Sequence, residues 1–454
     1  MEKNYIYHEA TISICPDCLE QIPAKIVFKD NKVFLIKTCP VHGKTTELFE
    51  EDIEYYLDKR SFDKPGTISE YQTVTGHGCP FDCGLCPDHD QHTCIGLIEV
   101  TNSCDLNCPT CYAESGKGGF LPLKRISRML DFFVKSEKKD AEILQISGGE
   151  PATHPDIIEI IELARKKNIK YVMLNTNGLR IAKEEGFARE LSKFEGEFEV
   201  YLQFDGFRPE TYSRLRGKNL SRIKLQAIEY LKKYNIPITL VTTVEKGVND
   251  NEIGKIIQFA IKTEGIRGVN FQPVAYFGRV KEVDTANRLT LSGIIRRIEQ
   301  QAPDLFRKGD IVPLPCNVER VAVTYMTRSK NGKFIPLTRD IKFKNYLPFI
   351  DNTFAFDVTK VLEDSTKELC DDAGCCSCMQ FATDISKNFP LDFMLKTKKE
   401  KKEYIDKNTF RVSITSFIDI YNFDIKSMQK ECVHVITPDL LKIPFSSYNM
   451  FYRK

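Results

Sequence analysis

The sequence has 454 residues and 16 cysteines, and its 65 lysines and arginines nearly balance 63 aspartates and glutamates. The net charge of +2 gives no basis for broad nucleic-acid binding. No apolar run approaches the roughly 18 residues of a membrane span, and the N-terminus has no signal-peptide pattern. We therefore expect a cytoplasmic protein of roughly two or three domains. Its cysteines are then metal or iron–sulfur ligands, with a secreted disulfide protein as the alternative.

Residues 1–60 are predicted to form a small metal-binding module. The segment AKIVFKDNKVFLIKTC alternates apolar and polar residues around an Asp-Asn turn, which is typical of a β-hairpin. Cys15 and Cys18 precede the hairpin, and Cys39 and His42 follow it, as in a zinc-ribbon or rubredoxin knuckle. These four side chains can complete a tetrahedral site for mononuclear zinc or iron. In the alternative interpretation, His42 is an ordinary surface residue and another ligand takes its place.

Residues 61–95 form a cysteine-rich connector. It contains Cys79, Cys83 and Cys86 in Cys-x3-Cys-x2-Cys spacing, followed by Cys94. Four thiolates can ligate every iron of a [4Fe-4S] cluster, which then serves electron transfer or structure. A four-cysteine zinc site is the alternative, because thiolate spacing alone does not fix the metal.

Strand and helix patterns alternate in residues 96–302. Six strands are predicted, within residues 96–103, 142–151, 171–178, 198–206, 237–247 and 268–278. Helical patterns separate them, within residues 126–137, 154–168, 184–194, 220–235 and 249–265. Such alternation builds a parallel sheet with helices outside, and six units are too few for a closed eight-stranded barrel. The fold class is therefore α/β, with a partial (β/α)6 barrel.

The first of these strands leads into a second cysteine triplet with the same spacing. Cys104, Cys108 and Cys111 have no fourth cysteine nearby. Three thiolates leave one iron of a [4Fe-4S] cluster open to a small molecule. A loop at the C-terminal end of a barrel strand is also where active sites of this architecture lie. These three cysteines are therefore the predicted catalytic ligands.

The segment TNSCDLNCPTCYAES resembles the signature of the radical S-adenosylmethionine (SAM) superfamily. The resemblance implies that SAM chelates the open iron and that reduction yields a 5′-deoxyadenosyl radical, which abstracts a hydrogen atom. It also implies a reductant protein such as ferredoxin or flavodoxin. The implied cofactor-binding residues are Tyr112, Ser147, Gly148, Gly149, Glu150, Pro151, Asn175, Asn177, Gln203, Asp205, Thr243, Glu245 and Gln272.

The flanking segments CPDC…TCPVHG, GHGCPFDCGLCPDHDQHTC and IDIYNFD…ECVHV…PFSSYN resemble one branch of that superfamily. The branch includes archaeal tetraether lipid synthases and pterin methyltransferases, and its members carry a rubredoxin-like centre and auxiliary [4Fe-4S] clusters. The resemblance implies attack on an unactivated C–H bond, with a lipid chain and C–C bond formation as the main expectation. Methylation of a pterin or other small heterocycle is the alternative. An iron–sulfur electron carrier is the non-enzyme alternative, although a carrier has no use for a vacant iron.

Residues 303–454 are predicted to form a cysteine-rich domain that holds an auxiliary cluster and part of the substrate site. The lipid expectation places an apolar tunnel to the open iron among the aromatic residues of this range, although these residues by themselves are better interpreted as core. The basic segment KTKKEKKEYIDK predicts a solvated helix or loop, and more weakly a contact with anionic lipid head groups. Branch tails carry cysteine near Ser446 or Ser447, so this metal site can differ. Its candidate ligands are Cys316, Cys370, Cys375, Cys376, Cys378 and Cys432, of which Cys432 is the one best interpreted as an ordinary buried thiol.

Overall fold

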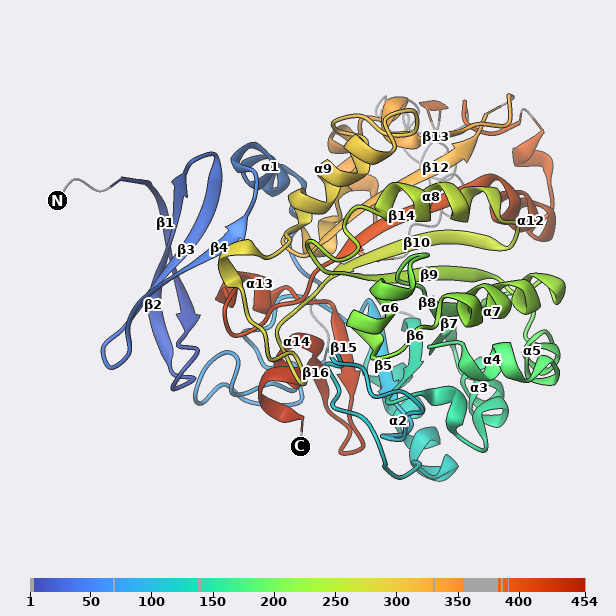
Figure 1. The fold of residues 1–454 in the computed structure, drawn as a ribbon, viewed down its shortest axis with the longest axis horizontal. Helices are drawn as coiled ribbons and strands as arrows, with labels where there is room; N and C mark the ends of the chain where they lie inside the picture. The colour runs from blue at the N-terminus through green and yellow to red at the C-terminus, as the bar shows by residue number, and fades with distance from the viewer. Residues whose placement is uncertain are drawn as a thin grey trace, which may run out of the picture.

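The computed structural model describes residues 4–67, 70–137, 141–329, 331–354, 383–384, 387–390 and 392–453. The described chain forms a small N-terminal sheet and one large sheet (Figure 1). No described helix is both long and apolar enough to cross a membrane. The predicted ligands Cys370, Cys375, Cys376 and Cys378 lie outside the described residues.

The N-terminal sheet is antiparallel and runs in sequence order. Its strands are β1 (Ile6–Ile14), β2 (Gln21–Lys29), β3 (Lys32–Cys39) and β4 (Gly43–Glu50). The predicted hairpin is β2–β3, and Asp30 and Asn31 at its turn have φ of 50° and 57°. Two consecutive positive φ values are what a tight hairpin turn requires, and Asp and Asn tolerate them well. The short helices α1 (Ile53–Asp58) and η1 (Lys59–Phe62) follow.

The large sheet contains the predicted partial barrel. Six consecutive strands pair in parallel: β5 (Ile95–Glu99), β6 (Ala141–Ser147), β7 (Ile169–Thr176), β8 (Phe198–Gln203), β9 (Ile238–Val244) and β10 (Ile266–Pro273). The connecting helices are α2 (Leu123–Ser136), η2 (Pro151–Thr153), α3 (Ile157–Arg165), α4 (Leu179–Lys183), α5 (Glu185–Leu191), α6 (Pro209–Arg216), α7 (Ser221–Lys233) and α8 (Ile253–Lys262). Figure 1 shows these helices on the outside of the sheet. The α/β partial-barrel prediction is confirmed.

The C-terminal part of the chain adds strands to both edges of this sheet. Next to β10 lie β14 (Thr409–Thr415), β12 (Val321–Arg328), β11 (Val312–Pro313) and β13 (Phe334–Pro336). Next to β5 lie β15 (Val433–Ile436) and β16 (Lys442–Pro444). Residues 303–454 therefore contribute to the barrel sheet itself, and the strand order, from β11 to β16, is open.

Helices connect and cover these added strands. They are η3 (Thr285–Asn287), α9 (Leu291–Gln301), η4 (Pro315–Asn317), η5 (Leu337–Arg339), η6 (Phe343–Phe349), η7 (Phe393–Leu395), α12 (Lys398–Asn408), α13 (Ile425–Gln429), α14 (Phe445–Ser447) and the π-helical turn η8 (Tyr448–Tyr452). Of the two structures expected for the basic segment, a helix or a loop, the chain forms the helix α12. A capping box between Thr397 and Glu400 starts this helix.

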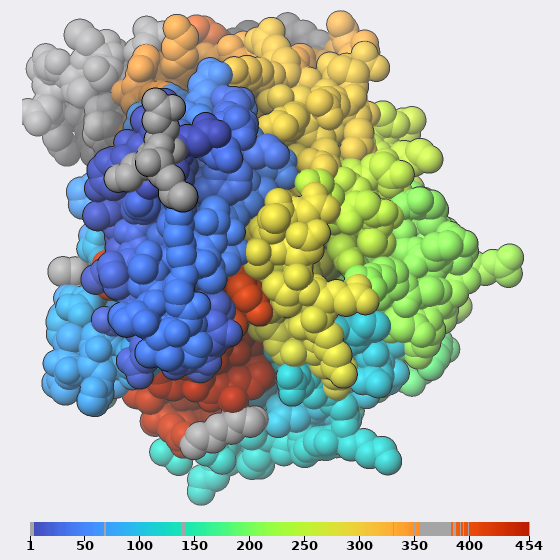
Figure 2. All heavy atoms as spheres, turned by 60° about the vertical axis from the view of Figure 1, so that its left-hand side comes forward, coloured from blue at the N-terminus to red at the C-terminus, as the bar shows by residue number. Residues whose placement is uncertain are grey.

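The N-terminal unit packs against the rest of the chain through polar contacts. Lys37 Nζ donates to the carbonyl of Ile420 at 2.7 Å, and Ser13 Oγ donates to that of Phe423 at 2.6 Å. Figure 2 shows this unit in blue, lying against the yellow segment after β10 and the red C-terminal segment. The metal knuckle therefore belongs to the same packed body as the barrel.

Candidate active site and metal centres

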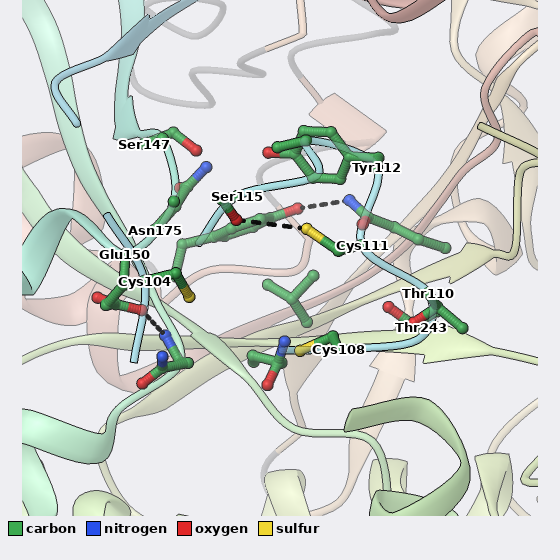
Figure 3. Close-up of a pocket in the computed structure, with 18 of the residues that line it drawn as sticks. Cys104, Cys108, Thr110, Cys111, Tyr112, Ser115, Ser147, Glu150, Asn175 and Thr243 are labelled. Carbon is green, nitrogen blue, oxygen red and sulfur yellow. Dashed lines mark hydrogen bonds between the residues drawn. The ribbon is translucent and has the colours of Figure 1, made fainter. Parts of the chain in front are cut away.

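The predicted catalytic triplet lies on the loop between β5 and α2. Figure 3 shows the sulfur atoms of Cys104, Cys108 and Cys111 around one central space, at a cavity of about 230 Å³. The guanidinium of Arg279 holds this loop by donating to the carbonyls of Ser115 and Cys108, the latter at 3.4 Å. The segment after β10 therefore anchors the backbone of the loop that carries the three thiols.

The two glycines of SGGEP allow the end of β6 to cross the cysteine loop closely. The backbone N–H of Gly149 donates to the carbonyl of Thr101 at 2.7 Å, and that of Glu150 donates to Ser103 at 2.8 Å. A Cβ on Gly148 would lie 2.3 Å from the Thr101 oxygen, and one on Gly149 would lie 2.2 Å from the Ser103 oxygen. Neither position has room for a side chain. The motif thus positions the cysteine loop through its backbone.

Glu150 ties the loop to the next strand end. Its buried carboxylate accepts hydrogen bonds from Asn177 N at 2.7 Å, Thr176 Oγ1 at 2.6 Å and Ala152 N at 3.0 Å. Burial raises the pKa of Glu150 to about 7, although these hydrogen bonds oppose the shift. These hydrogen bonds to the protein show that the Glu150 carboxylate positions the loop against the end of β7.

Most predicted cofactor-binding residues line the cavity. They are Tyr112, Ser147, Gly148, Gly149, Glu150, Pro151, Asn175, Asn177, Gln203, Thr243 and Gln272. Two predicted residues do not line it. Asp205 is fully buried behind the wall, and Glu245 lies in a neighbouring cavity of about 950 Å³, where it forms an ion pair with Arg214 at 2.7 Å. Glu245 and Asp205 therefore act on other side chains in this structure.

Asp205 holds an arginine that the sequence analysis missed. Arg216, at the end of α6, donates to both carboxylate oxygens of Asp205 at 2.7 Å and to Thr243 Oγ1 at 2.8 Å. It also contacts the Cys108 thiol and lines the cavity. An arginine on an amphipathic helix carries no sequence signal for this role, because the contact joins the loop after β5 to the helix after β8.

A second buried cation, Lys224 on α7, lies below the same wall. Its Nζ donates to Gln203 Oε1 at 2.9 Å and to the carbonyl of Asn177. Burial lowers the pKa of Lys224 to about 8, with the nearby Asp205 carboxylate opposing the shift. Lys224 therefore holds two residues of the cavity lining, Asn177 and Gln203, in place.

The residues around the cavity fit a cluster with bound SAM. Burial raises the pKa of the Cys104 thiol to about 12, so a bound metal is what would favour its thiolate. The three sulfur atoms are not all within 4.8 Å of one another, which suits a cluster better than a single ion. Asn175 Oδ1 is buried without a hydrogen-bond partner among the described residues. Such an acceptor suits the amino group of a bound ligand.

The N-terminal knuckle has the geometry of a site for a single ion. The ligand atoms of Cys15, Cys18, Cys39 and His42 all lie within 4.8 Å of one another. His42 Nδ1 is 3.4 Å from Cys15 Sγ and 3.5 Å from Cys39 Sγ, and the sulfur atoms of Cys18 and Cys39 are 3.9 Å apart. The structure thus brings the imidazole to the three thiols, as the main interpretation expected.

The connector triplet differs from the prediction in its fourth ligand. Cys79, Cys83 and Cys86 border one small cavity. Cys94 lies instead directly before β5, where its sulfur is within 4.8 Å of those of Cys316 and Cys432. Ser447 also lies beside the triplet, with its Oγ 3.1 Å from Cys83 Sγ.

Cys432 is therefore one of three clustered cysteines and not an isolated buried thiol. The pairing of β15 with β5 brings it beside Cys94. The sequence gap of more than three hundred residues between Cys94 and Cys432 hid this contact.

Comparisons with known proteins agree with the motifs. Residues 98–260 match the family model of the radical SAM superfamily, and residues 7–51 match that of the HMPTM N-terminal zinc ribbon domain. The 7,8-dihydro-6-hydroxymethylpterin dimethyltransferase of Methanocaldococcus jannaschii is 33% identical over 98% of this chain and 94% of its own length.

Other similarities are confined to part of the chain. A probable GTP 3′,8-cyclase of Thermococcus kodakarensis is 31% identical over 37% of this chain and 52% of its own length. Streptococcus suis SuiB bound to precursor peptide SuiA aligns with a TM-score of 0.41 at 18% identity, over 48% of this chain and 47% of that one. The full-length similarity shows that the chain is a radical SAM enzyme and belongs to the same family as the Methanocaldococcus jannaschii dimethyltransferase.

Proposed function

We propose that this enzyme methylates a pterin or a closely related small heterocycle. The observation that carries the proposal is the similarity to a pterin dimethyltransferase over almost the whole of both chains. The similarity extends beyond the barrel motif to the zinc ribbon and the C-terminal segment. The proposal thus favours the heterocycle alternative of the sequence analysis over the lipid chain.

The cavity wall supports a flat, partly polar substrate. Phe445 is part of this wall, and its ring centroid is 5.2 Å from that of Tyr112, 4.6 Å from that of Phe417 and 6.5 Å from that of Phe277. Such rings offer stacking surfaces to a bicyclic heterocycle. Gln272 and the other amide side chains that line the cavity offer hydrogen bonds to its ring edges.

The bound cluster and SAM would supply the radical that removes a hydrogen atom from the substrate, and a separate methyl donor, a second SAM or another one-carbon carrier, would supply the added carbon. The chain's own residues would do the rest. Cys104, Cys108 and Cys111 would hold the cluster, and Asn175 would accept a hydrogen bond from the amino group of SAM. The aromatic wall around Phe445 would orient the substrate and exclude water from the reacting atoms.

The lipid interpretation lacks comparable support. Its tunnel was predicted to be lined mostly by residues 303–454. Among the described residues, the cavity lining takes only Phe417, Val433 and Phe445 from that range, and the remainder comes from the barrel. Neither tetraether formation nor a lipid substrate is named among the similar proteins reported above.

The test compares two substrates under the same anaerobic conditions. Reduced enzyme with SAM receives either 7,8-dihydro-6-hydroxymethylpterin or a detergent-solubilised phospholipid. We expect formation of 5′-deoxyadenosine that depends on the pterin, together with a pterin product that has gained methyl groups by mass. Stimulation by the phospholipid and none by the pterin would refute the proposal.

Two matched variants sharpen this test. Phe445→Ala removes the central ring of the wall and is expected to weaken pterin binding. Phe334→Ala removes a buried ring that packs against Phe410 away from the cavity, so pterin binding should be retained. Equal loss in both variants would indicate a general effect on folding.

A further inference from the structure

Three cysteines from distant parts of the chain form a buried group that neither the mechanism nor the zinc ribbon uses. Cys94, Cys316 and Cys432 are each 0% exposed, and their sulfur atoms lie within 4.8 Å of one another. We propose that they bind one zinc or iron ion, and that this ion fastens together the two edges of the open barrel sheet. The proposal is independent of the substrate.

The spacing of the sulfur atoms fits a single tetrahedral ion. With metal–sulfur bonds of about 2.3 Å, two sulfur ligands of a tetrahedral site lie about 3.8 Å apart. The sulfur atoms of Cys316 and Cys432 are 4.0 Å apart. This compares with 3.9 Å between Cys18 and Cys39 in the N-terminal knuckle of the same chain. No disulfide joins these two cysteines in the structure, because the sulfur atoms of a disulfide lie about 2.05 Å apart.

His92 lies beside these sulfur atoms, but its Nε2 is not within 4.8 Å of all three, so the described side chains supply three ligands and no fourth. Its Nδ1 contacts Thr67 Oγ1 and, at 3.0 Å, Gln91 Nε2. Because the Gln91 amide donates to Nδ1, the neutral ring carries its proton on Nε2, which faces Cys94 Sγ at 3.8 Å as a hydrogen-bond donor. Glu142 Oε1, 3.9 Å from the same Nε2, completes the polar side of the group.

The place of the group in the fold gives it a structural consequence. Cys94 and Cys432 precede β5 and β15, and the backbone N–H of Cys94 donates to the carbonyl of Cys432 at 3.0 Å. Cys316 lies in η4, between β11 and β12 at the opposite end of the strand order. A shared ion would link these two ends of the sheet, which no strand pairing joins among the described strands.

The same connection would support the active-site wall. The three cysteines pack in one apolar cluster with Leu97, Val433 and Phe445. All three of these apolar residues also line the catalytic cavity. An ion bound by the three cysteines would therefore stabilise the cavity wall without contacting the substrate.

The test is metal analysis of the full-length protein, purified without oxygen. Cys316→Ser and Cys432→Ser are each expected to lose about one zinc or iron per chain, as for a single-ion site. The double variant should lose no more than either single variant, because both residues serve one ion. Val323→Ala, a buried neighbour in the same cluster, is the control and should keep its full metal content.

A second measurement does not depend on the folding of a variant. Crystals of the wild-type protein should show one anomalous-scattering peak, at the zinc or iron edge, between the three sulfur atoms. The absence of that peak, or unchanged metal content in both single variants, would overturn the proposal. Loss of about four irons would overturn the single-ion assignment, because that number indicates a [4Fe-4S] cluster.

Discussion

Replacing Gly149 by alanine should damage the active site without altering any ligand. The new Cβ would lie 2.2 Å from the carbonyl oxygen of Ser103 and 2.9 Å from that of Asn102. Both atoms belong to the backbone of the cysteine loop, so the loop has to move. Overpacking of this kind costs about 1–3 kcal/mol. The hydrogen bond from Glu150 N to Ser103 O would be strained as well, which adds about 1 kcal/mol.

The expected result for Gly149→Ala is a loss of about 2–4 kcal/mol in the free energy of unfolding, the sum of these two effects. Cluster iron and SAM cleavage should fall with it, because the three thiols no longer face one space. Denaturant unfolding, iron analysis and 5′-deoxyadenosine formation measure these effects. Gly119→Ala is the matched control, since it lies in the same loop and its Cβ would meet nothing within 4 Å. If Gly149→Ala behaves like this control, the close-crossing argument is wrong.

Three further predictions concern the buried charges and the knuckle. Arg216→Gln leaves the Asp205 carboxylate buried without its charged partner, so we expect a loss of about 3–5 kcal/mol in the free energy of unfolding. The reduction potential of the cluster, from an EPR-monitored titration, should become more negative because a positive charge is lost beside it. An unchanged potential would contradict the contact with Cys108. Because burial lowers the pKa of Lys224 from 10.5 to about 8, the unfolded chain binds more protons between these pH values. The stability of wild type relative to Lys224→Met should therefore rise by about 3 kcal/mol across that window, and a flat difference in pH-dependent unfolding would refute this. Cys39→Ser should lose the knuckle's single metal ion in elemental analysis while the cluster iron remains, and a loss of cluster iron instead would contradict the assignment.

The sequence by itself determined the features whose residues lie close together along the chain. The hairpin turn at Asp30 and Asn31 needs only two residues that tolerate positive φ. The knuckle and the catalytic triplet are set by short cysteine spacings, and alternating strand and helix patterns predict the open barrel because burial imposes those periods. The SGGEP motif also places itself at a strand end.

The tertiary structure decided the features that depend on which distant segments meet. Cys94 is eight residues from Cys86 in sequence, yet it joins Cys316 and Cys432, because β15 pairs with β5 and η4 lies beside them. Arg216 meets Cys108 only because the helix after β8 returns to the loop after β5. Strand pairing and core packing choose these contacts among many that are open to the chain, and no local spacing encodes that choice.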